Sequence, residues 1–86
     1  MIKYQNKSGK SGILNYETGE TYILVEFRSG EIIYRYTYES AGKENVEEMK
    51  RLANIGEGLN SYIMRYCRTL YEKDPKTNLP INWRKN

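Results

Sequence analysis

The sequence of 86 residues contains no histidine and only one cysteine. Without histidine, catalytic triads and dyads that depend on an imidazole are excluded, and so are metal sites with histidine ligands. A single thiol, Cys67, excludes a disulfide within the chain and any zinc site that needs several cysteines. These absences argue against catalysis. We therefore expect a protein that is not an enzyme and that uses no cofactor and no metal.

Long apolar segments are missing as well. No stretch approaches the ~18 residues of a membrane-spanning helix, and residues 1–10 lack the apolar core of a signal peptide. Together with the free cysteine, this predicts a cytoplasmic protein with no membrane contact. A chain of this length forms one domain with a small core, because it buries only about 60–65% of its unfolded surface.

Phenylalanine and tryptophan occur once each, whereas tyrosine occurs nine times, so the core has to accommodate many hydroxyl groups. The net charge is +3, and the basic excess lies mostly near the two ends of the sequence, outside the acidic stretch 11–42. We expect a basic arm over residues 1–10, one domain over residues 11–74 and a tail over residues 75–86. The tail carries apolar side chains, Leu79, Ile81 and Trp83, that could pack on the domain, but the sequence leaves open whether the tail docks there.

Two runs rich in β-branched and aromatic residues, 22–28 and 31–38, flank Ser29-Gly30 and predict a hairpin with a two-residue turn. Placing Val25 opposite Tyr34 collects apolar side chains on one face, whereas a shift by one residue would mix the two faces. In the same register Ile23 pairs with Tyr36 and Phe27 with Ile32. The other face then carries Tyr22, Leu24, Arg28, Ile33 and Arg35.

A third strand is predicted over residues 13–16, with Leu14 opposite Ile23 and with Leu14 and Tyr16 on the apolar face. Three strands with one apolar face need a cover. The first covering helix is expected to begin at Asn45, as an N-cap paired with Glu48. It ends at Gly56 in a left-handed cap and buries a stripe of Val46, Met49, Leu52 and Ala53.

Helical spacing of apolar and aromatic residues predicts a second helix from Gly58 to Asp74-Pro75. Its stripe consists of Leu59, Tyr62, Ile63, Tyr66, Leu70 and Tyr71. Cys67 borders this stripe and is interpreted as a small packing residue. The expected fold class is α+β, with a three-stranded antiparallel meander and two helices packed on one face.

Tyr34, Tyr36 and Tyr38 share one side of a strand and admit two interpretations. Aromatic side chains on a sheet can stack on RNA bases, but the register places these three on the helix-covered face, as core. The uncovered face would instead expose Leu24 and Ile33, together with Ile13, as an apolar patch. Such patches contact protein more often than RNA.

Val25-Glu26-Phe27-Arg28-Ser29-Gly30 followed by Tyr34-Arg35-Tyr36 resembles the strand, turn and Y-x-Y strand of the KTSC domain family. Gly56, Asn60 and Ile63 are similar to a further motif of that family, and the likeness covers about residues 11–66. The proline that usually precedes the first helix of the family is missing from residues 39–43. The resemblance implies a small α+β domain of bacteria or phages, also found at the C-terminus of some lysyl-tRNA synthetases. The function of such domains is unassigned, with RNA binding suggested for them, and the resemblance implies no catalytic residues.

Two function hypotheses follow. The first is a non-enzymatic module that binds nucleic acid, most simply RNA, through basic side chains that contact phosphates. The residues expected to contribute are Lys7, Lys10, Tyr22, Arg28, Arg35, Arg65 and Arg68. The alternative is a protein-interaction or self-association module that uses the sheet face with Leu24 and Ile33.

Overall fold

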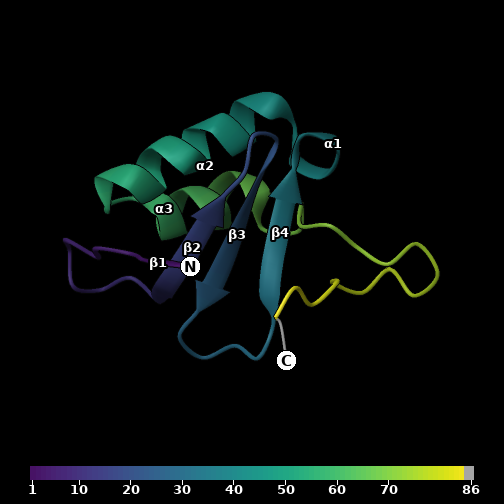
Figure 1. Ribbon diagram of the computed structural model, residues 1–86, viewed down its shortest axis with the longest axis horizontal. Helices are drawn as coiled ribbons and strands as arrows, with labels where there is room; N and C mark the ends of the chain where they lie inside the picture. Colours follow the sequence, from purple (N-terminus) through teal and green to yellow (C-terminus); the bar gives the residue numbers. More distant parts are fainter. Residues whose placement is uncertain (85–86) are drawn as a thin grey trace.

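The computed structural model describes residues 1–84 and confirms the α+β class, with four antiparallel strands in the order β1-β2-β3-β4. The strands are β1 (Ile2–Lys3), β2 (Ile13–Thr18), β3 (Tyr22–Phe27) and β4 (Ile33–Thr37). The helical elements are α1 (Tyr38–Ala41), α2 (Lys43–Ile55), α3 (Leu59–Tyr62) and the π-helical segment η1 (Ile63–Cys67). Figure 1 shows α2 and α3 on the same side of the sheet. No helix within residues 1–84 is long and apolar enough to cross a membrane.

The predicted register between β3 and β4 is confirmed over the ladder that forms, where Val25 lies opposite Tyr34. The ladder ends at Glu26 and Ile33, so the predicted two-residue turn is wrong, and so is the Phe27–Ile32 pair. Beyond Glu26 the chain turns toward β2, where the Arg28 amide donates to the Gly12 carbonyl at 2.6 Å. Residues 28–32 therefore form a wider loop.

The predicted pairing of Leu14 with Ile23 is wrong. Ile13 lies opposite Phe27, and a bulge between Ile13 and Asn15 shifts the register of β2 against β3. The extra residue lets both Ile13 and Tyr16 face the helices, because the bulge interrupts the strict alternation of a strand. Ile13 is consequently buried in the core, contrary to the expectation that it lies on the open face.

The fourth strand, β1, corrects the prediction of three strands. It pairs with β2 through two residues, too few for a periodic pattern to reveal it in the sequence. The segment that follows is anchored by Tyr4, which is 2% exposed and whose hydroxyl accepts a hydrogen bond from the Leu59 amide. The first ten residues thus contribute to both the sheet and the core.

Helix α2 buries Val46, Met49 and Ala53 against the sheet, as predicted, and ends at Gly56 in the left-handed conformation. Its N-cap is Gly42, so the prediction of Asn45 as the cap is wrong. The reason is that the Asn45 side chain makes tertiary contacts, donating to the Ala41 carbonyl and accepting from the Tyr62 hydroxyl. The short helix α1, which precedes α2, was not predicted.

The second predicted helix is shorter than expected and changes its winding. After α3 the chain continues as a π-helix and leaves helical structure after Cys67, well before Pro75. Leu59, Ile63 and Cys67, four residues apart, are fully buried because the wide turn aligns every fourth residue. Tyr66, predicted in the buried stripe, is 55% exposed.

The C-terminal segment docks along the free edge of β4. The Glu72 amide donates to the Arg35 carbonyl at 2.7 Å, and the Trp83 amide donates to the Ile33 carbonyl at 3.0 Å. In Figure 1 this yellow-green segment loops out past β4 and returns beside it. The segment thereby satisfies backbone groups that an edge strand would otherwise present to another chain.

Candidate nucleic-acid interface

The seven residues predicted to contact nucleic acid fall into two groups. Five of them are exposed and form no ion pair with another residue of the range 1–84: Lys7, Lys10, Arg28, Arg65 and Arg68. The other two, Tyr22 and Arg35, are half-buried and contact each other. We call the surface formed by the first five residues the basic end.

Backbone contacts bring the segments that carry the basic end together. The Lys7 amide donates to the Gly56 carbonyl at 2.9 Å, which places residues 5–12 against the turn between α2 and α3. Lys10 lines a shallow depression together with Gly58 and Asn60 at the start of α3. The bond from the Arg28 amide to Gly12 then joins this loop to the loop after β3.

The helical part of the basic end has no acidic side chain between Gly58 and Tyr71. Its outer surface combines Arg65 and Arg68 with two exposed side chains, Met64 and Tyr66, which are 46% and 55% exposed. The Tyr66 ring lies 4.9 Å from that of Tyr62, which supports it from one side. An exposed ring among unpaired arginines is a suitable platform for a nucleobase next to its phosphates.

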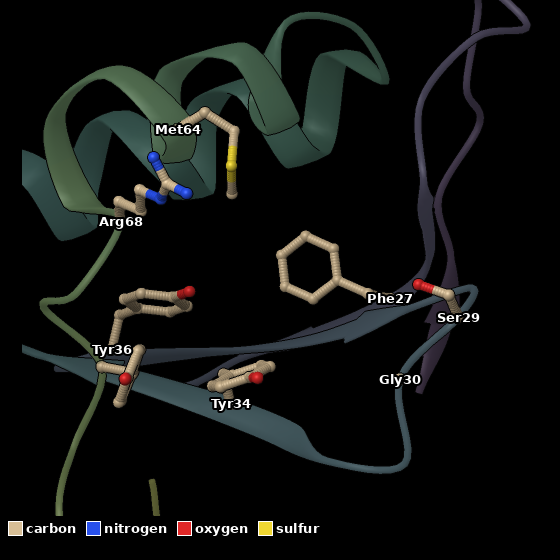
Figure 2. Close-up of a pocket in the computed structure, with 8 residues that line it drawn as sticks. Phe27, Ser29, Gly30, Tyr34, Tyr36, Met64 and Arg68 are labelled. Carbon is tan, nitrogen blue, oxygen red and sulfur yellow. The ribbon is translucent and has the colours of Figure 1, made fainter. Parts of the chain in front are cut away.

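A pocket of about 310 Å³ opens between η1 and the ends of β3 and β4. Figure 2 shows Met64 and Arg68 reaching down from the helix on one side, with Phe27 and Tyr34 on the strand side. The aromatic rings that line the pocket contact one another. The ring centre of Tyr34 lies 5.8 Å from that of Phe27 and 5.0 Å from that of Tyr71. The pocket is therefore mainly aromatic with one cation at its rim.

The sequence interpretation missed Phe27, Tyr34 and Tyr71 as site residues because their positions in the pattern marked them as core. They are only half-buried, since η1 ends at Cys67 and leaves the end of the sheet beyond it uncovered. A helix reaching Pro75 would have covered this end. The sequence does not indicate this early end of the helix, because the Thr69-Leu70 region carries no strong stop signal.

Arg35 and Tyr22 lie on the opposite face of the sheet, away from the helices. The Arg35 guanidinium lies between the rings of Trp83 and Tyr22, at 4.0 Å and 5.2 Å from their centres. The same guanidinium pairs with both carboxylate oxygens of Glu72, at 3.0 and 3.1 Å. Three side chains, those of Tyr22, Trp83 and Glu72, thus hold the Arg35 guanidinium. The arginines of the basic end form no ion pair within residues 1–84.

The outer sheet face is not the open apolar patch that we expected. Ile33 is only 6% exposed, and Leu24 is half-buried. Both line a depression with Trp83 and Arg84 from the C-terminal segment, and Arg84 pairs with Glu26 at 2.9 Å. A hydrogen bond from Asn15 and this ion pair lower the pKa of the Glu26 carboxyl. The tail is the cover that the sequence left undetermined.

Cys67 has no feature of a reactive thiol. It is fully buried in the helix layer, and burial raises the pKa of its thiol. The described residues hold no cluster of three or more potential metal-ligating acidic or cysteine side chains.

Comparisons of the chain with protein-family models, with curated proteins and with solved structures each returned no match. The likeness to the KTSC domain therefore stays a prediction.

Proposed function

We propose that this protein is a non-enzymatic cytoplasmic module that binds single-stranded RNA through the basic end. The observation that carries the proposal is that Lys7, Lys10, Arg28, Arg65 and Arg68 are all exposed without an ion pair among residues 1–84, on segments in mutual contact. Unpaired cations on adjoining segments attract a phosphate backbone, and the release of counterions from that backbone favours binding. The resemblance to the KTSC family supports the same conclusion.

Single-stranded RNA fits this surface better than a duplex does. The exposed ring of Tyr66 and the open aromatic pocket offer faces on which unpaired bases can stack, and paired bases inside a helix cannot reach them. Stacking of this kind is tolerant of sequence, because every base has a π-face. We therefore expect modest sequence preference and strong dependence on salt.

The alternative, protein interaction or self-association through the sheet face with Leu24 and Ile33, has less support. Binding there would require Trp83 and Arg84 to leave, at the cost of the stacking on Arg35 and of the ion pair with Glu26. The covered face thus favours RNA at the basic end over a partner protein at the sheet.

The proposal is tested by measuring fluorescence anisotropy of a short labelled single-stranded RNA across a salt series. Arg28→Ala and Arg68→Ala should each weaken binding and each reduce the slope of log affinity against log salt, by about 0.7 for every lost phosphate contact. Arg51→Ala is the matched control, because Arg51 is also exposed but pairs with Glu48 on α2.

Absence of binding at low salt, or equal slopes for the Arg28, Arg68 and Arg51 variants, would overturn the proposal. A DNA strand of the same sequence forms a second arm of the experiment. Equal affinity for DNA would show that the surface reads phosphates and bases without using the 2′-hydroxyl. Measuring the mass in solution at the same concentrations tests the alternative, because self-association predicts a dimer.

A further inference from the structure

The base of the aromatic pocket carries a hydroxyl group without a partner. Tyr36 lines the pocket and is only 2% exposed as a whole residue, and its hydroxyl forms no hydrogen bond with any other residue of the range 1–84. The hydroxyl oxygen itself is not enclosed by protein, so it is reached through the open pocket. The hydroxyl groups of Tyr4, Tyr38 and Tyr62 form hydrogen bonds within the range 1–84, whereas those of Tyr16 and Tyr36 do not. Because the pocket is open to this oxygen, the hydroxyl of Tyr36 can exchange a bound water for a polar group of a ligand.

The surroundings of this hydroxyl keep it neutral. Burial raises the pKa of Tyr36 strongly, and the neighbouring ionisable groups of Tyr34, Cys67 and Tyr71 raise it further. A neutral phenol both donates and accepts a hydrogen bond, so it can meet either a carbonyl or a ring nitrogen at the edge of a ligand. The pocket floor therefore offers one adaptable polar contact among apolar walls.

The walls select a flat ring. Figure 2 shows Tyr34 on the strand side of the pocket, with the Met64 thioether and the Arg68 guanidinium opposite it on the helix side. Tyr71 also lines the pocket, with its ring centre 5.0 Å from that of Tyr34. A planar heterocycle fits between aromatic faces and a guanidinium plane, because both stack on π-systems. The volume of about 310 Å³ is at the lower end of the range of ligand pockets, about 300–1,000 Å³, and suits one such group.

The rim supplies a contact for the phosphate attached to that ring. Arg68 lines the pocket with no ion pair among residues 1–84, and Ser29 and Gly30, next to Arg28, form the opposite rim. A guanidinium binds phosphate with two parallel hydrogen bonds. An apolar slot, a polar floor and a cation at the mouth together match the three parts of a nucleotide.

We propose that this pocket binds one nucleobase, with the Tyr36 hydroxyl on its polar edge and with Arg68 on its phosphate. The proposal extends the proposed RNA-binding function, since a base leaving a single strand that lies on the basic end can enter this pocket. The same chemistry is also present in a free nucleoside monophosphate. The experiment therefore includes both sources.

Tyr36→Phe is the decisive variant, because it removes only the hydroxyl and keeps the ring that packs in the core. Because this hydroxyl bonds no other residue of the range 1–84 and is not enclosed, its removal should leave the melting temperature of the variant close to that of the wild type. Its affinity for the four nucleoside monophosphates and for short homopolymeric RNAs should fall about 3- to 10-fold for the preferred base, as expected for one lost hydrogen bond. Arg68→Ala should weaken binding of the monophosphates but not of the matching nucleosides.

Arg65→Ala serves as the control. Arg65 does not line the pocket, so its loss should weaken RNA binding and leave binding of mononucleotides unchanged. Loss of affinity in Tyr36→Phe with unchanged stability supports the pocket. If RNA binds with the expected salt slope but Tyr36→Phe binds every probe as the wild type does, the pocket is refuted and the proposed function stands.

The failure of the proposed function looks different. In that case no RNA binds at low salt, and the mononucleotide titration alone decides about the pocket. Binding of a monophosphate that depends on the Tyr36 hydroxyl would identify a site for free nucleotides. Absence of binding of both RNA and mononucleotides would overturn the inference.

Discussion

Replacing Gly56 and Gly58 by alanine, one at a time, measures how closely the N-terminal segment packs on the turn between α2 and α3. Both glycines have a φ of +85°, so each alanine takes on the same left-handed strain. Their surroundings differ. A Cβ at Gly58 would meet only a Leu52 methyl at 3.6 Å, whereas a Cβ at Gly56 would lie 2.5 Å from Cβ of Gln5.

The magnitudes follow from these distances. The left-handed strain costs about 1–2 kcal/mol, and the stiffer unfolded chain of the alanine variant returns about 0.4–1 kcal/mol. Gly58→Ala should therefore destabilise by about 1 kcal/mol. Gly56→Ala adds the overlap with Gln5, which lowers the free energy of unfolding by about a further 1–3 kcal/mol, as overpacking does in cores. Because 1 kcal/mol corresponds to about 4–8 °C in a domain of this size, Gly56→Ala should melt at least ~4 °C below Gly58→Ala.

Thermal unfolding followed by circular dichroism measures both melting temperatures under identical conditions. The double variant Gln5→Gly/Gly56→Ala provides a further control, because removing Cβ of Gln5 removes the overlap and should restore part of the loss. Equal melting temperatures for the two alanine variants would refute the close packing of residues 5–12. The result matters for function, because this packing holds Lys7 next to Gly56.

Three further outcomes are expected. The pKa of Glu26 is lowered in the folded state, so its contribution to stability is present at neutral pH and is lost as the pH falls below 4.5. Urea unfolding at pH 7 and at about pH 3 measures this loss of stability, which should be smaller in Asn15→Ala than in the wild type because the hydrogen bond from Asn15 is gone. Cys67 should react slowly with a thiol reagent in the folded protein and rapidly in denaturant, since it is buried with a raised pKa. Trp83→Ala should lower the melting temperature by about 4 °C or more, because it removes the cation–π contact with Arg35 and exposes the outer face of the sheet. Leu79→Ala is the control and should leave the melting temperature unchanged, because Leu79 is 62% exposed.

The central hairpin and the core stripe of α2 were predictable because their patterns repeat over several residues. The alternation of apolar side chains around Val25 and Tyr34 allows only one register, and Val46, Met49 and Ala53 recur at helical spacing. These signals are local and redundant. They place β3, β4 and α2 correctly without knowledge of the rest of the chain.

The features that shape the candidate site depend on single residues or on distant contacts. The bulge beside Ile13, the two-residue strand β1 and the π-helical winding of η1 leave no periodic signal in the sequence. The position of Tyr34 in the strand predicts a core residue. Because η1 ends early, Tyr34 lines a pocket instead. The exposure of Lys7, Lys10, Arg28, Arg65 and Arg68 is what their charge alone predicts, whereas the half-buried position of Arg35 depends on its contact with Trp83.

The central claim is that RNA binds at the basic end and not on the outer face of the sheet. Titration of the isotope-labelled protein with a short single-stranded RNA, followed by two-dimensional NMR, tests this residue by residue. We predict that amide signals of Lys10, Arg28 and Arg68 shift with RNA concentration, while those of Arg35 and Trp83 stay in place. Shifts confined to Arg35 and Trp83, or no shifts at low salt, would contradict the account.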